Sequence, residues 1–553
     1  MIYPKIPLAQ SIIQICLAKG IRDIVISPGS RNAPLTIGFA SNNNFKSYSI
    51  ADERCAAFFA LGMAQQIKRP VALVCTSGSA LLNYYPAVAE AFYSQIPLIV
   101  ISADRPQNKI DIGDGQTIRQ ENVFANHSLY NANLTEEVSK INDHKINEAI
   151  DIACFQKGPV HINAPFEEPL YETVSKLSVD AMVHHFAALN PIVSLEDLTV
   201  FATIWKQSTK KLVLVGVNEP DAISNATVEA FAQDESVVVM TETTSNLHHP
   251  SFISNIDTII TPFTQEDFED FCPDILITFG GMIVSKRIKA FLRKYKPKHH
   301  WHIDPLRAYD TFGVLTKHFE VHPNAFFTAF LPLIHSVKSD YFAKMSRIQA
   351  IRKEKQDLFL SKVSYSDFYV FDKLLKTLPE NSQLQISNSS AIRYAQLMEI
   401  PSSVEVFCNR GTSGIDGSTS TAIGAAVANN KPTVFITGDI GFLYDSNALW
   451  NNYIPKNFKI ILVNNGGGGI FRILPGHNET EVFHTFFETS HNLTAEHLAK
   501  MYGFEYSLAS DEASLEKSLT TLYSQKEKPS ILEIFTPTLE NNKILLQYFR
   551  ELT

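Results

Sequence analysis

Two oxygen-bearing side chains of this sequence, Asp439 and Asn465, have the types and spacing to share a divalent cation. Asp439 follows an apolar, β-rich segment at residues 434–436, and Asn465 follows another at residues 460–463. Parallel strands would bring both side chains to the carboxyl edge of one sheet, where open α/β sheets bind ligands. One carboxylate and one carboxamide leave a hard cation short of its octahedral oxygen shell, and a phosphate-bearing ligand would complete that shell. The pattern therefore indicates a cation and phosphate site, unless both segments merely end in ordinary turns.

Cationic side chains also gather where other apolar segments end. Residues 27–32 read Ser-Pro-Gly-Ser-Arg-Asn after a predicted strand, and the N–H groups of such a turn and helix start favour an anion. Arg31 adds a planar fork suited to a carboxylate, although a helix start capped by Ser30 explains the same residues. Further arginines follow strand ends in a chain of negative net charge: Arg105, Arg393 and Arg410. Each alone is typical of a surface, whereas together they indicate a pocket for small anions bearing several carboxylates.

The elements that must position these residues alternate along the chain. Short apolar runs that stop at Gly, Ser, Asp or Pro are separated by helical patterns, in three successive sets. Such alternation predicts βαβ units whose parallel sheets are buried on both faces. We therefore predict an α/β fold of three domains, each with a mainly parallel sheet flanked by helices, over residues 1–185, 186–355 and 356–553. The two outer sets are similar in length and ordering.

Composition narrows the class of protein. With 45% hydrophobic and 19% charged residues, the 553-residue chain has an ordinary globular composition. A formal net charge of −9 argues against nonspecific nucleic-acid binding, and no stretch has the character of a membrane span. Six scattered cysteines fit reduced thiols in the cytoplasm. The cluster of His299, His300 and His302 could ligate a metal, but we expect it to form a partly buried strand instead.

Taken in order, these motifs resemble the thiamine-diphosphate-dependent enzymes. Gly-Asp at residues 438–439 followed by Asn-Asn at residues 464–465 is typical of that whole superfamily. Two further motifs are far more selective, and they are similar to the menaquinone-pathway branch that joins 2-oxoglutarate to isochorismate. They are Ser-Pro-Gly-Ser-Arg at residues 27–31 and the run from Asn-Arg-Gly to Ser-Gly-Ile-Asp-Gly at residues 409–417.

The resemblance implies a pyrimidine-binding first domain, a central domain without cofactor and a diphosphate-binding third domain. Thiamine diphosphate would lie between the first domain of one subunit and the third domain of another, so the protein would be a homodimer or homotetramer. 2-Oxoglutarate would lose carbon dioxide on this cofactor, and the remaining four-carbon unit would add to isochorismate.

The resemblance also implies residue roles. Glu53 would activate the cofactor rather than serve its helix as a cap or dipole partner, and Ile415 would force the cofactor into its bent shape. Asp439, Asn465 and the Gly467 carbonyl would hold Mg²⁺ or Mn²⁺. The other cofactor-binding residues would be Ser77, Gly78 and Gly438. The substrates would meet Ser30, Arg31, Arg105, Gln116, Lys286, Arg287, Ser389, Arg393 and Arg410, with Ile470, Phe471 and Leu474 as an apolar wall.

Two departures from the family pattern and two alternatives stand beside this hypothesis. Ile440 replaces the third glycine of Gly-Asp-Gly, and the glycine-rich loop after Asn465 leaves open whether Asn464 or Asn465 is the metal ligand. An acetolactate-synthase type of enzyme with FAD in the central domain would use monocarboxylates, so the arginines count against it. A non-catalytic protein of the same fold would have lost Glu53 or Asp439, and both are present.

Overall fold

The computed structural model describes residues 2–185, 195–473, 476, 478–525 and 527–553. Its strands form three all-parallel sheets of six, five and six strands, and a small antiparallel pair of β1 (Tyr3–Pro4) and β8 (Thr173–Val174). The predicted α/β fold of three mainly parallel sheets is confirmed. The first and third sheets share one strand order, β3-β2-β4-β5-β7-β6 and β15-β14-β16-β17-β19-β18, which confirms the similar ordering expected for the outer sets.

The central strands of the first sheet are buried throughout. This burial indicates that helices cover both faces of the sheet. Its strands are β2 (Asp23–Ile26), β3 (Lys46–Ser49), β4 (Val71–Cys75), β5 (Leu98–Asp104), β6 (Tyr130–Asn133) and β7 (Pro159–Pro165). Its helices are α1 (Pro7–Ala18), α2 (Ala33–Ala40), α3 (Glu53–Ile67), α4 (Ser79–Asn83), α5 (Tyr85–Ser94), η1 (Gln107–Lys109) and α6 (Lys140–Gln156).

The second sheet has the order β10-β9-β11-β12-β13. Its strands are β9 (Lys211–Val215), β10 (Val237–Thr241), β11 (Ile275–Phe279), β12 (His299–Ile303) and β13 (Lys317–Phe319). Its helices are α7 (Leu195–Gln207), α8 (Asn225–Gln233), η2 (Thr243–Ser245), α9 (Ile256–Ile260), α10 (Gln265–Phe271), α11 (Lys286–Lys294), α12 (Pro323–Phe330), η3 (Leu331–Leu333) and α13 (Tyr341–Leu360). The histidine cluster lies in β12 as expected, and His300 is buried there beside Thr278.

The third sheet carries the predicted cation residues. Its strands are β14 (Gln383–Ile386), β15 (Glu405–Phe407), β16 (Thr433–Gly438), β17 (Phe458–Asn464), β18 (Glu505–Ala509) and β19 (Ser530–Phe535). Its helical segments up to the glycine-rich loop are α14 (Asp367–Lys376), α15 (Ser390–Ala395), α16 (Ser418–Ala428), α17 (Asp439–Tyr444) and η4 (Ser446–Leu449). After that loop come η5 (Gly469–Ile473), α18 (Glu481–Phe483), the π-helix η6 (His484–Glu488), α19 (Glu496–Met501), α20 (Glu512–Ser524) and α21 (Asn541–Glu551).

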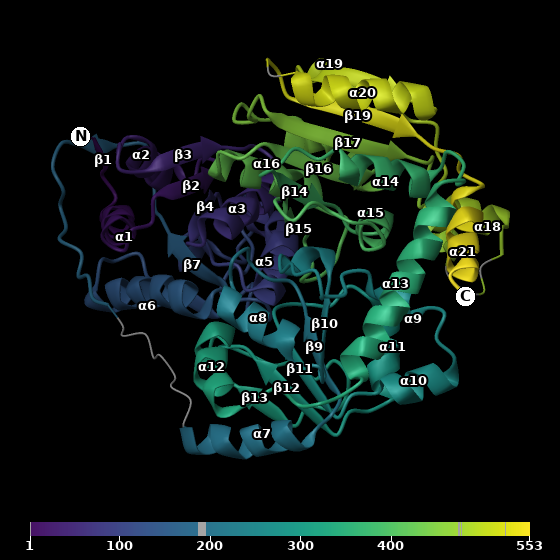
Figure 1. The fold of residues 1–553 in the computed structure, drawn as a ribbon. Helices are drawn as coiled ribbons and strands as arrows, with labels where there is room; N and C mark the ends of the chain where they lie inside the picture. The colour runs from purple at the N-terminus through teal and green to yellow at the C-terminus, as the bar shows by residue number, and fades with distance from the viewer. Residues whose placement is uncertain (1, 186–194, 474–475, 477, 526) are drawn as a thin grey trace.

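The first and third sheets share a core. Figure 1 shows α3 beside α16, between the purple first sheet and the green third sheet, with the teal second sheet below them. One buried apolar cluster joins Phe58 and Phe59 of α3 to Ile423 of α16 and Phe442 of α17. Packing between α3 and α16 therefore fixes how the helix that begins at Glu53 lies relative to the third sheet.

The limits predicted for the three domains stay predictions. Residue 186 and the segment up to residue 194 lie outside the described residues, and residue 356 falls within α13. Among the described residues, no helix is both long enough and apolar enough to cross a membrane.

Candidate active site

Asp439 and the glycine-rich loop meet at the carboxyl edge of the third sheet. β16 ends at Gly438 and pairs in parallel with β17, which ends at Asn464. Asp439 is 3% exposed, and its Oδ2 accepts a 2.9 Å hydrogen bond from the Gly467 N–H. Its Oδ1 accepts another from the Ile440 N–H at 2.7 Å. The structure therefore brings Asp439 and Gly467 together across two adjacent strands.

The two neighbouring asparagines differ in what they contact. Asn464 donates from Nδ2 to Glu533 at 2.7 Å and to the Leu493 carbonyl at 2.9 Å, and its Oδ1 accepts the Gly466 N–H at 3.1 Å. Asn464 is thereby occupied by contacts within the fold. Asn465 donates from Nδ2 to Asp367 at 3.0 Å. Its side-chain oxygen forms no hydrogen bond with the residues that the structure describes, so the contacts favour Asn465 as a ligand.

The electrostatics of this edge fit a divalent cation. Burial raises the pKa of Asp439, and the N–H groups of Ile440 and Gly467 and the nearby His491 counter that rise only in part. His491 Nδ1 accepts the Leu493 N–H, and the other ring nitrogen, Nε2, lies 3.4 Å from Asp439 Oδ2. A cation would hold the buried carboxylate in its charged form.

The donor set also fits a hard cation. Within the described ranges, no group of three or more His, Cys, Asp and Glu side chains could hold a metal. A cation at this edge would therefore depend on carboxamide and backbone oxygens beside Asp439, which are the ligands that Mg²⁺ and Mn²⁺ accept. A Cβ placed on Gly438 would meet nothing within 4 Å, so the chain leaves open space directly before Asp439.

Glu53 begins α3 without serving as its cap. The cap is Asp52, whose side chain accepts the Cys55 N–H at 3.1 Å and an Asn447 N–H at 2.9 Å. Glu53 is half-buried, and its Oε2 lies 3.4 Å from Asn83 Nδ2. The alternative role as cap therefore falls to Asp52, which leaves the Glu53 carboxylate available for another function.

Other predicted cofactor residues lie at the ends of strands in both outer sheets. Ser77 and Gly78 follow β4, where Ser77 Oγ donates to the Gln116 carbonyl at 2.9 Å. Gly78 has φ +87°, and a Cβ on it would lie 3.2 Å from the same carbonyl oxygen. Ile415 lies beside the start of α17, since a Cβ on Gly441 would be 3.9 Å from the Ile415 carbonyl oxygen. Gln116 is thus brought to Ser77 and Gly78, and Ile415 to the strand end that carries Asp439.

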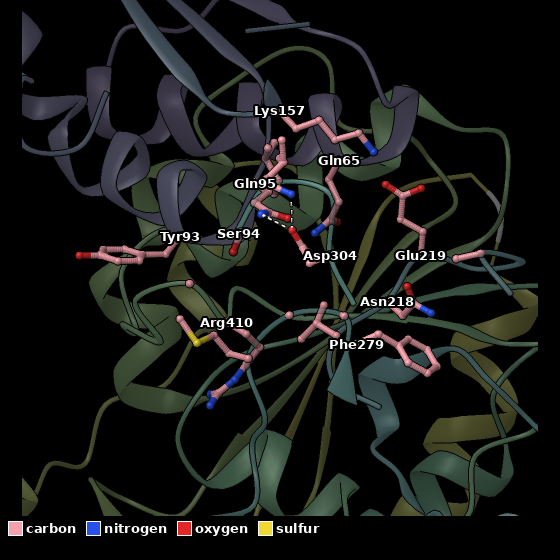
Figure 2. Close-up of a pocket in the computed structure, with 18 of the residues that line it drawn as sticks. Gln65, Tyr93, Ser94, Gln95, Lys157, Asn218, Glu219, Phe279, Asp304 and Arg410 are labelled. Carbon is pink, nitrogen blue, oxygen red and sulfur yellow. Dashed lines mark hydrogen bonds between the residues drawn. The ribbon is translucent and has the colours of Figure 1, made fainter. Parts of the chain in front are cut away.

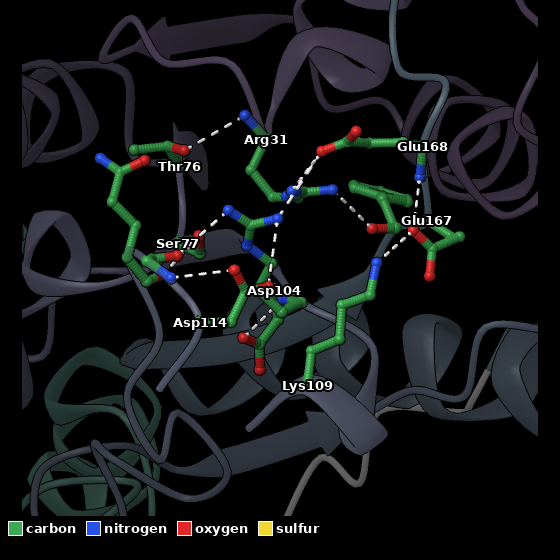
Figure 3. Close-up of polar contacts among 12 residues, drawn as sticks. Arg31, Thr76, Ser77, Asp104, Lys109, Asp114, Glu167 and Glu168 are labelled. Atoms are coloured by element: carbon green, nitrogen blue, oxygen red, sulfur yellow. Dashed lines mark hydrogen bonds and ion pairs between the residues drawn. The ribbon is translucent and has the colours of Figure 1, made fainter. Parts of the chain in front are cut away.

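Two of the predicted arginines converge on Glu168 in the first domain. Figure 3 shows one of them, Arg31, beside Glu168. Arg31 is 3% exposed and donates from Nη2 to Glu168 Oε1 at 3.0 Å. Arg105 places Nη1 3.6 Å from the same oxygen and donates from Nη2 to the Gly115 carbonyl at 3.1 Å. Ser30 is exposed next to Arg31. Two guanidinium groups that share one carboxylate form a suitable binding site for an anion.

A second cationic group lies between the second and third domains. Arg410 donates from Nη1 to Asn388 Oδ1 at 2.7 Å, directly before Ser389 at the start of α15. Burial lowers the pKa of Arg393, and the charge of Arg410 lowers it further, so the two guanidinium groups lie near enough to repel each other. Ser389, Arg393 and Arg410 are therefore brought together.

Helix α11 extends this group from the central domain. Lys286 and Arg287 are exposed in its first turn, and the Arg287 guanidinium lies 4.8 Å from the Phe549 ring centre. Lys289, which the sequence did not single out, lies one turn further. Burial lowers the pKa of Lys289, Glu242 raises it, and the charge of Arg410 lowers it again, which places Lys289 among these groups.

The predicted apolar wall follows the glycine-rich loop. Ile470 and Phe471 lie in η5, and the Phe471 ring meets Phe487 at 6.0 Å between ring centres. Arg472 and Glu488 form a buried, bidentate ion pair next to them. Leu474 lies outside the described residues.

One cavity is separate from the cation edge. It has a volume of about 740 Å³ and is lined by residues of all three domains. Figure 2 shows Gln95 and Asp304 next to each other on its lining, where Gln95 Nε2 donates a 3.5 Å hydrogen bond to Asp304 Oδ1. Arg410 is the predicted site residue on its wall, so this cavity reaches the cationic group but not Asp439.

Comparisons with known proteins agree with the three-domain arrangement. Residues 6–128 match the family described as thiamine pyrophosphate enzyme, N-terminal TPP binding domain, and residues 388–534 match its C-terminal TPP binding domain. Residues 197–386 match the family described as middle domain of thiamine pyrophosphate. The resemblance to thiamine-diphosphate enzymes is therefore confirmed.

Curated relatives narrow the family. Proteins named 2-succinyl-5-enolpyruvyl-6-hydroxy-3-cyclohexene-1-carboxylate synthase are 70% identical in Flavobacterium johnsoniae and 52% identical in Christiangramia forsetii. These alignments cover 100% of both chains in the first case and 99% of both in the second. A synthase of the same name from Porphyromonas gingivalis is 37% identical over 96% of this chain and 94% of its own. The chain therefore belongs to the thiamine pyrophosphate enzymes and, within them, to the family of 2-succinyl-5-enolpyruvyl-6-hydroxy-3-cyclohexene-1-carboxylate synthases.

Proposed function

We propose that this protein catalyses the decarboxylation of 2-oxoglutarate and the addition of the remaining four-carbon unit to isochorismate. The product would be 2-succinyl-5-enolpyruvyl-6-hydroxy-3-cyclohexene-1-carboxylate, an intermediate of menaquinone biosynthesis. The observation that carries the proposal is the 70% identity over the whole chain with a synthase of that name. The acetolactate-type alternative receives no comparable support.

The chain's own residues would hold the cofactor from two sheets. Asp439, Asn465 and the Gly467 carbonyl would bind Mg²⁺ or Mn²⁺, which in turn would bind the diphosphate of thiamine diphosphate. Gly438, Ser77 and Gly78 would lie against the cofactor. Ile415 would support the cofactor from the third domain.

The bound cofactor supplies the carbon nucleophile and the electron sink for carbon dioxide loss and carbon–carbon bond formation. Glu53 would hold a proton at the N1′ atom of the pyrimidine ring. Its position at the helix start, with capping left to Asp52, supports that role.

The cationic groups would position the two substrates. Arg31 and Arg105 would pair with a substrate carboxylate. Ser30 and Gln116 would form hydrogen bonds with substrate hydroxyl groups. Arg393 and Arg410, with Ser389, would meet a second carboxylate. Lys286 and Arg287 would close this side from the central domain, and the apolar wall of Ile470, Phe471 and Leu474 would exclude water.

We also propose a cytoplasmic homodimer or homotetramer whose active sites lie at subunit interfaces. Exposed apolar side chains support an oligomer: Leu82 is 43%, Tyr444 is 53% and Trp450 is 59% exposed. They lie on α4, at the end of α17 and just after η4. The proposed domain limits of residues 1–185, 186–355 and 356–553 belong to the same arrangement.

The experiment that tests the function is incubation with 2-oxoglutarate, thiamine diphosphate and Mg²⁺, with and without isochorismate, followed by mass analysis. Product formation that requires both substrates and the metal is expected. Glu53→Gln should abolish carbon dioxide release while thiamine diphosphate still binds. Undiminished turnover by that variant would refute the role of Glu53, and absence of the product from wild-type protein would refute the function itself.

A further inference from the structure

A buried carboxylate outside the predicted site contacts the proposed metal ligand Asn465. Asp367 Oδ2 accepts a 3.0 Å hydrogen bond from Asn465 Nδ2, although the two residues are 98 positions apart in the chain. Asp367 is the first residue of α14 and is 3% exposed. Ser366 is the cap of that helix, because its side chain accepts the Tyr369 N–H. Asp367 is therefore not needed to begin the helix.

Three hydrogen bonds fix the orientation of Asp367. Its Oδ1 accepts a 2.6 Å hydrogen bond from Thr536 Oγ1, just after β19, and its own N–H donates to Asn541 Oδ1 at 2.9 Å. Since β19 is the neighbour of β17, the carboxylate is anchored to the strand next to the one that leads to Asn465. With both oxygens engaged, the carboxylate cannot turn away from the amide.

An ionised carboxylate can only accept hydrogen bonds, whereas an asparagine amide has one accepting end and one donating end. Contact with Asp367 therefore selects the nitrogen of Asn465 and leaves its oxygen as the end that can ligate a cation. The Asn465 backbone is held as well, since its carbonyl accepts a 2.6 Å hydrogen bond from Thr538 Oγ1.

We propose that Asp367 is a positioning residue that orients the carboxamide of Asn465 toward the bound divalent cation. This inference rests on the proposed metal site. Groups in direct contact with metal ligands commonly contribute a factor of about 10 to 100 to metal affinity, because they fix the orientation of the ligand. Thr536 engages Oδ1 and Asn541 accepts the backbone N–H, so Oδ2 of the carboxylate is left to the Asn465 amide.

The test is Asp367→Asn, with Mn²⁺ affinity measured by electron paramagnetic resonance in the presence of thiamine diphosphate. An asparagine at this position can present either end to Asn465, so the amide loses its fixed orientation. Mn²⁺ affinity is expected to fall about 10- to 100-fold, while the melting temperature of the metal-free protein stays near that of wild type. The matched control is Asp372→Asn on the same helix, where the carboxylate pairs with Lys376 at 2.6 Å, and its Mn²⁺ affinity should not change.

Two further variants separate positioning from a structural role. If Asp367 acts through Asn465, adding Asp367→Asn to Asn465→Ala should cost little further affinity. Asn465→Asp would place two carboxylates against each other, and it should bind Mn²⁺ more weakly than wild type despite its added charge. This variant keeps the test decisive if Asp367→Asn fails to fold.

Three results would overturn the inference. They are wild-type Mn²⁺ affinity in a folded Asp367→Asn, a loss of melting temperature without loss of affinity, and tighter binding by Asn465→Asp. A wild-type protein that binds thiamine diphosphate without Mn²⁺ or Mg²⁺ would instead overturn the metal site itself, and this inference with it.

Discussion

Gly62 packs so closely on the backbone of Thr421 that a Cβ on Gly62 would lie 2.0 Å from the Thr421 carbonyl oxygen. The relation is reciprocal, because a Cβ on Gly424 would lie 2.0 Å from the Phe59 carbonyl oxygen. Helices α3 and α16 thus cross with their backbones in contact at two glycines. That crossing joins the helix that begins at Glu53 to the domain that carries Asp439.

Gly62→Ala should separate these helices. Alanine is the better helix former by about 1 kcal/mol, but the clash is with backbone atoms, which cannot rotate away. We expect the free energy of unfolding to fall by about 1–3 kcal/mol, the usual cost of an overpacked core. Urea unfolding followed by circular dichroism measures it. Gly115→Ala is the control, since a Cβ there meets nothing within 4 Å, and equal stability of both variants would contradict the prediction.

Glu90 of the first domain should control the position of Arg410. The Glu90 carboxylate is 1% exposed and accepts hydrogen bonds from the Gly411 N–H at 2.7 Å and from the Thr412 N–H at 2.6 Å. Glu90→Gln leaves one accepting oxygen for these two backbone donors and removes the charge that strengthens both hydrogen bonds, at a cost of about 1–3 kcal/mol. We expect kcat/KM for the carboxylate substrates to fall about 10- to 100-fold, with unchanged affinity for thiamine diphosphate.

The control for Glu90 lines the same cavity. Glu219 is half-exposed and pairs with Lys68 at 3.0 Å, so Glu219→Gln should leave the kinetics unchanged. If Glu90→Gln lowers only the melting temperature and not kcat/KM, the carboxylate serves the fold alone.

The sequence predicts the sheets better than it predicts the contacts around the site. The buried strands follow apolar runs that are visible in the sequence, whereas β6, β13 and β18 have no such run. All three lie at sheet edges, where one side has no partner strand and apolar side chains are less necessary. The similar length and ordering of the two outer sets of apolar runs corresponds to the strand order that the first and third sheets share.

The residues around the metal site show where prediction from sequence ends. Asp439 and Asn465 follow buried strands and form a motif, so their convergence could be predicted from topology alone. Asp367 and Glu90 gave no such signal, because an acidic residue in a helix has the same appearance whether it faces solvent or a distant loop. Their partners lie 98 and 321 positions away, and only the folded chain brings them together.

Glu488 should make the stability of the chain depend on pH in the acid range. Burial alone would raise its pKa, but hydrogen bonds from Arg472, His484 and Ser490 outweigh burial and lower the pKa to about 2. An unfolded glutamate titrates near 4.5, so this stabilisation is fully present above that pH and is lost as the pH falls toward 2.

The measurement is urea unfolding of wild type and Glu488→Gln at pH 7 and pH 4. The difference in free energy of unfolding should narrow by roughly 1 kcal/mol at the lower pH, because Glu488 takes up a proton in the unfolded wild type there, whereas the variant has no carboxylate at this position. Glu479→Gln is the comparison, since that carboxylate also contacts Arg472 but is 46% exposed, and its difference from wild type should narrow less. A difference that stays constant or widens at pH 4 would show that folding does not lower the pKa of Glu488.

Arg31 should not be replaceable by lysine, despite the retained charge. Its guanidinium donates to the Phe166 carbonyl at 3.1 Å and to Glu168 at 3.0 Å, so its plane is fixed toward Arg105. A lysine ammonium cannot make this planar set of contacts and bind a carboxylate with two N–H groups. We expect Arg31→Lys to lower kcat/KM for isochorismate at least about 10-fold, the cost of a charge-assisted hydrogen bond. Thiamine diphosphate affinity, measured by fluorescence quenching, should not change.

The matched control is Arg119→Lys, because the Arg119 side chain is 83% exposed and pairs only with Asp111 among the described residues. If both variants kept wild-type kinetics, the anion-binding site formed by Arg31 and Arg105 would have no role in substrate binding. The substrate carboxylates would then have to be bound by Arg393 and Arg410.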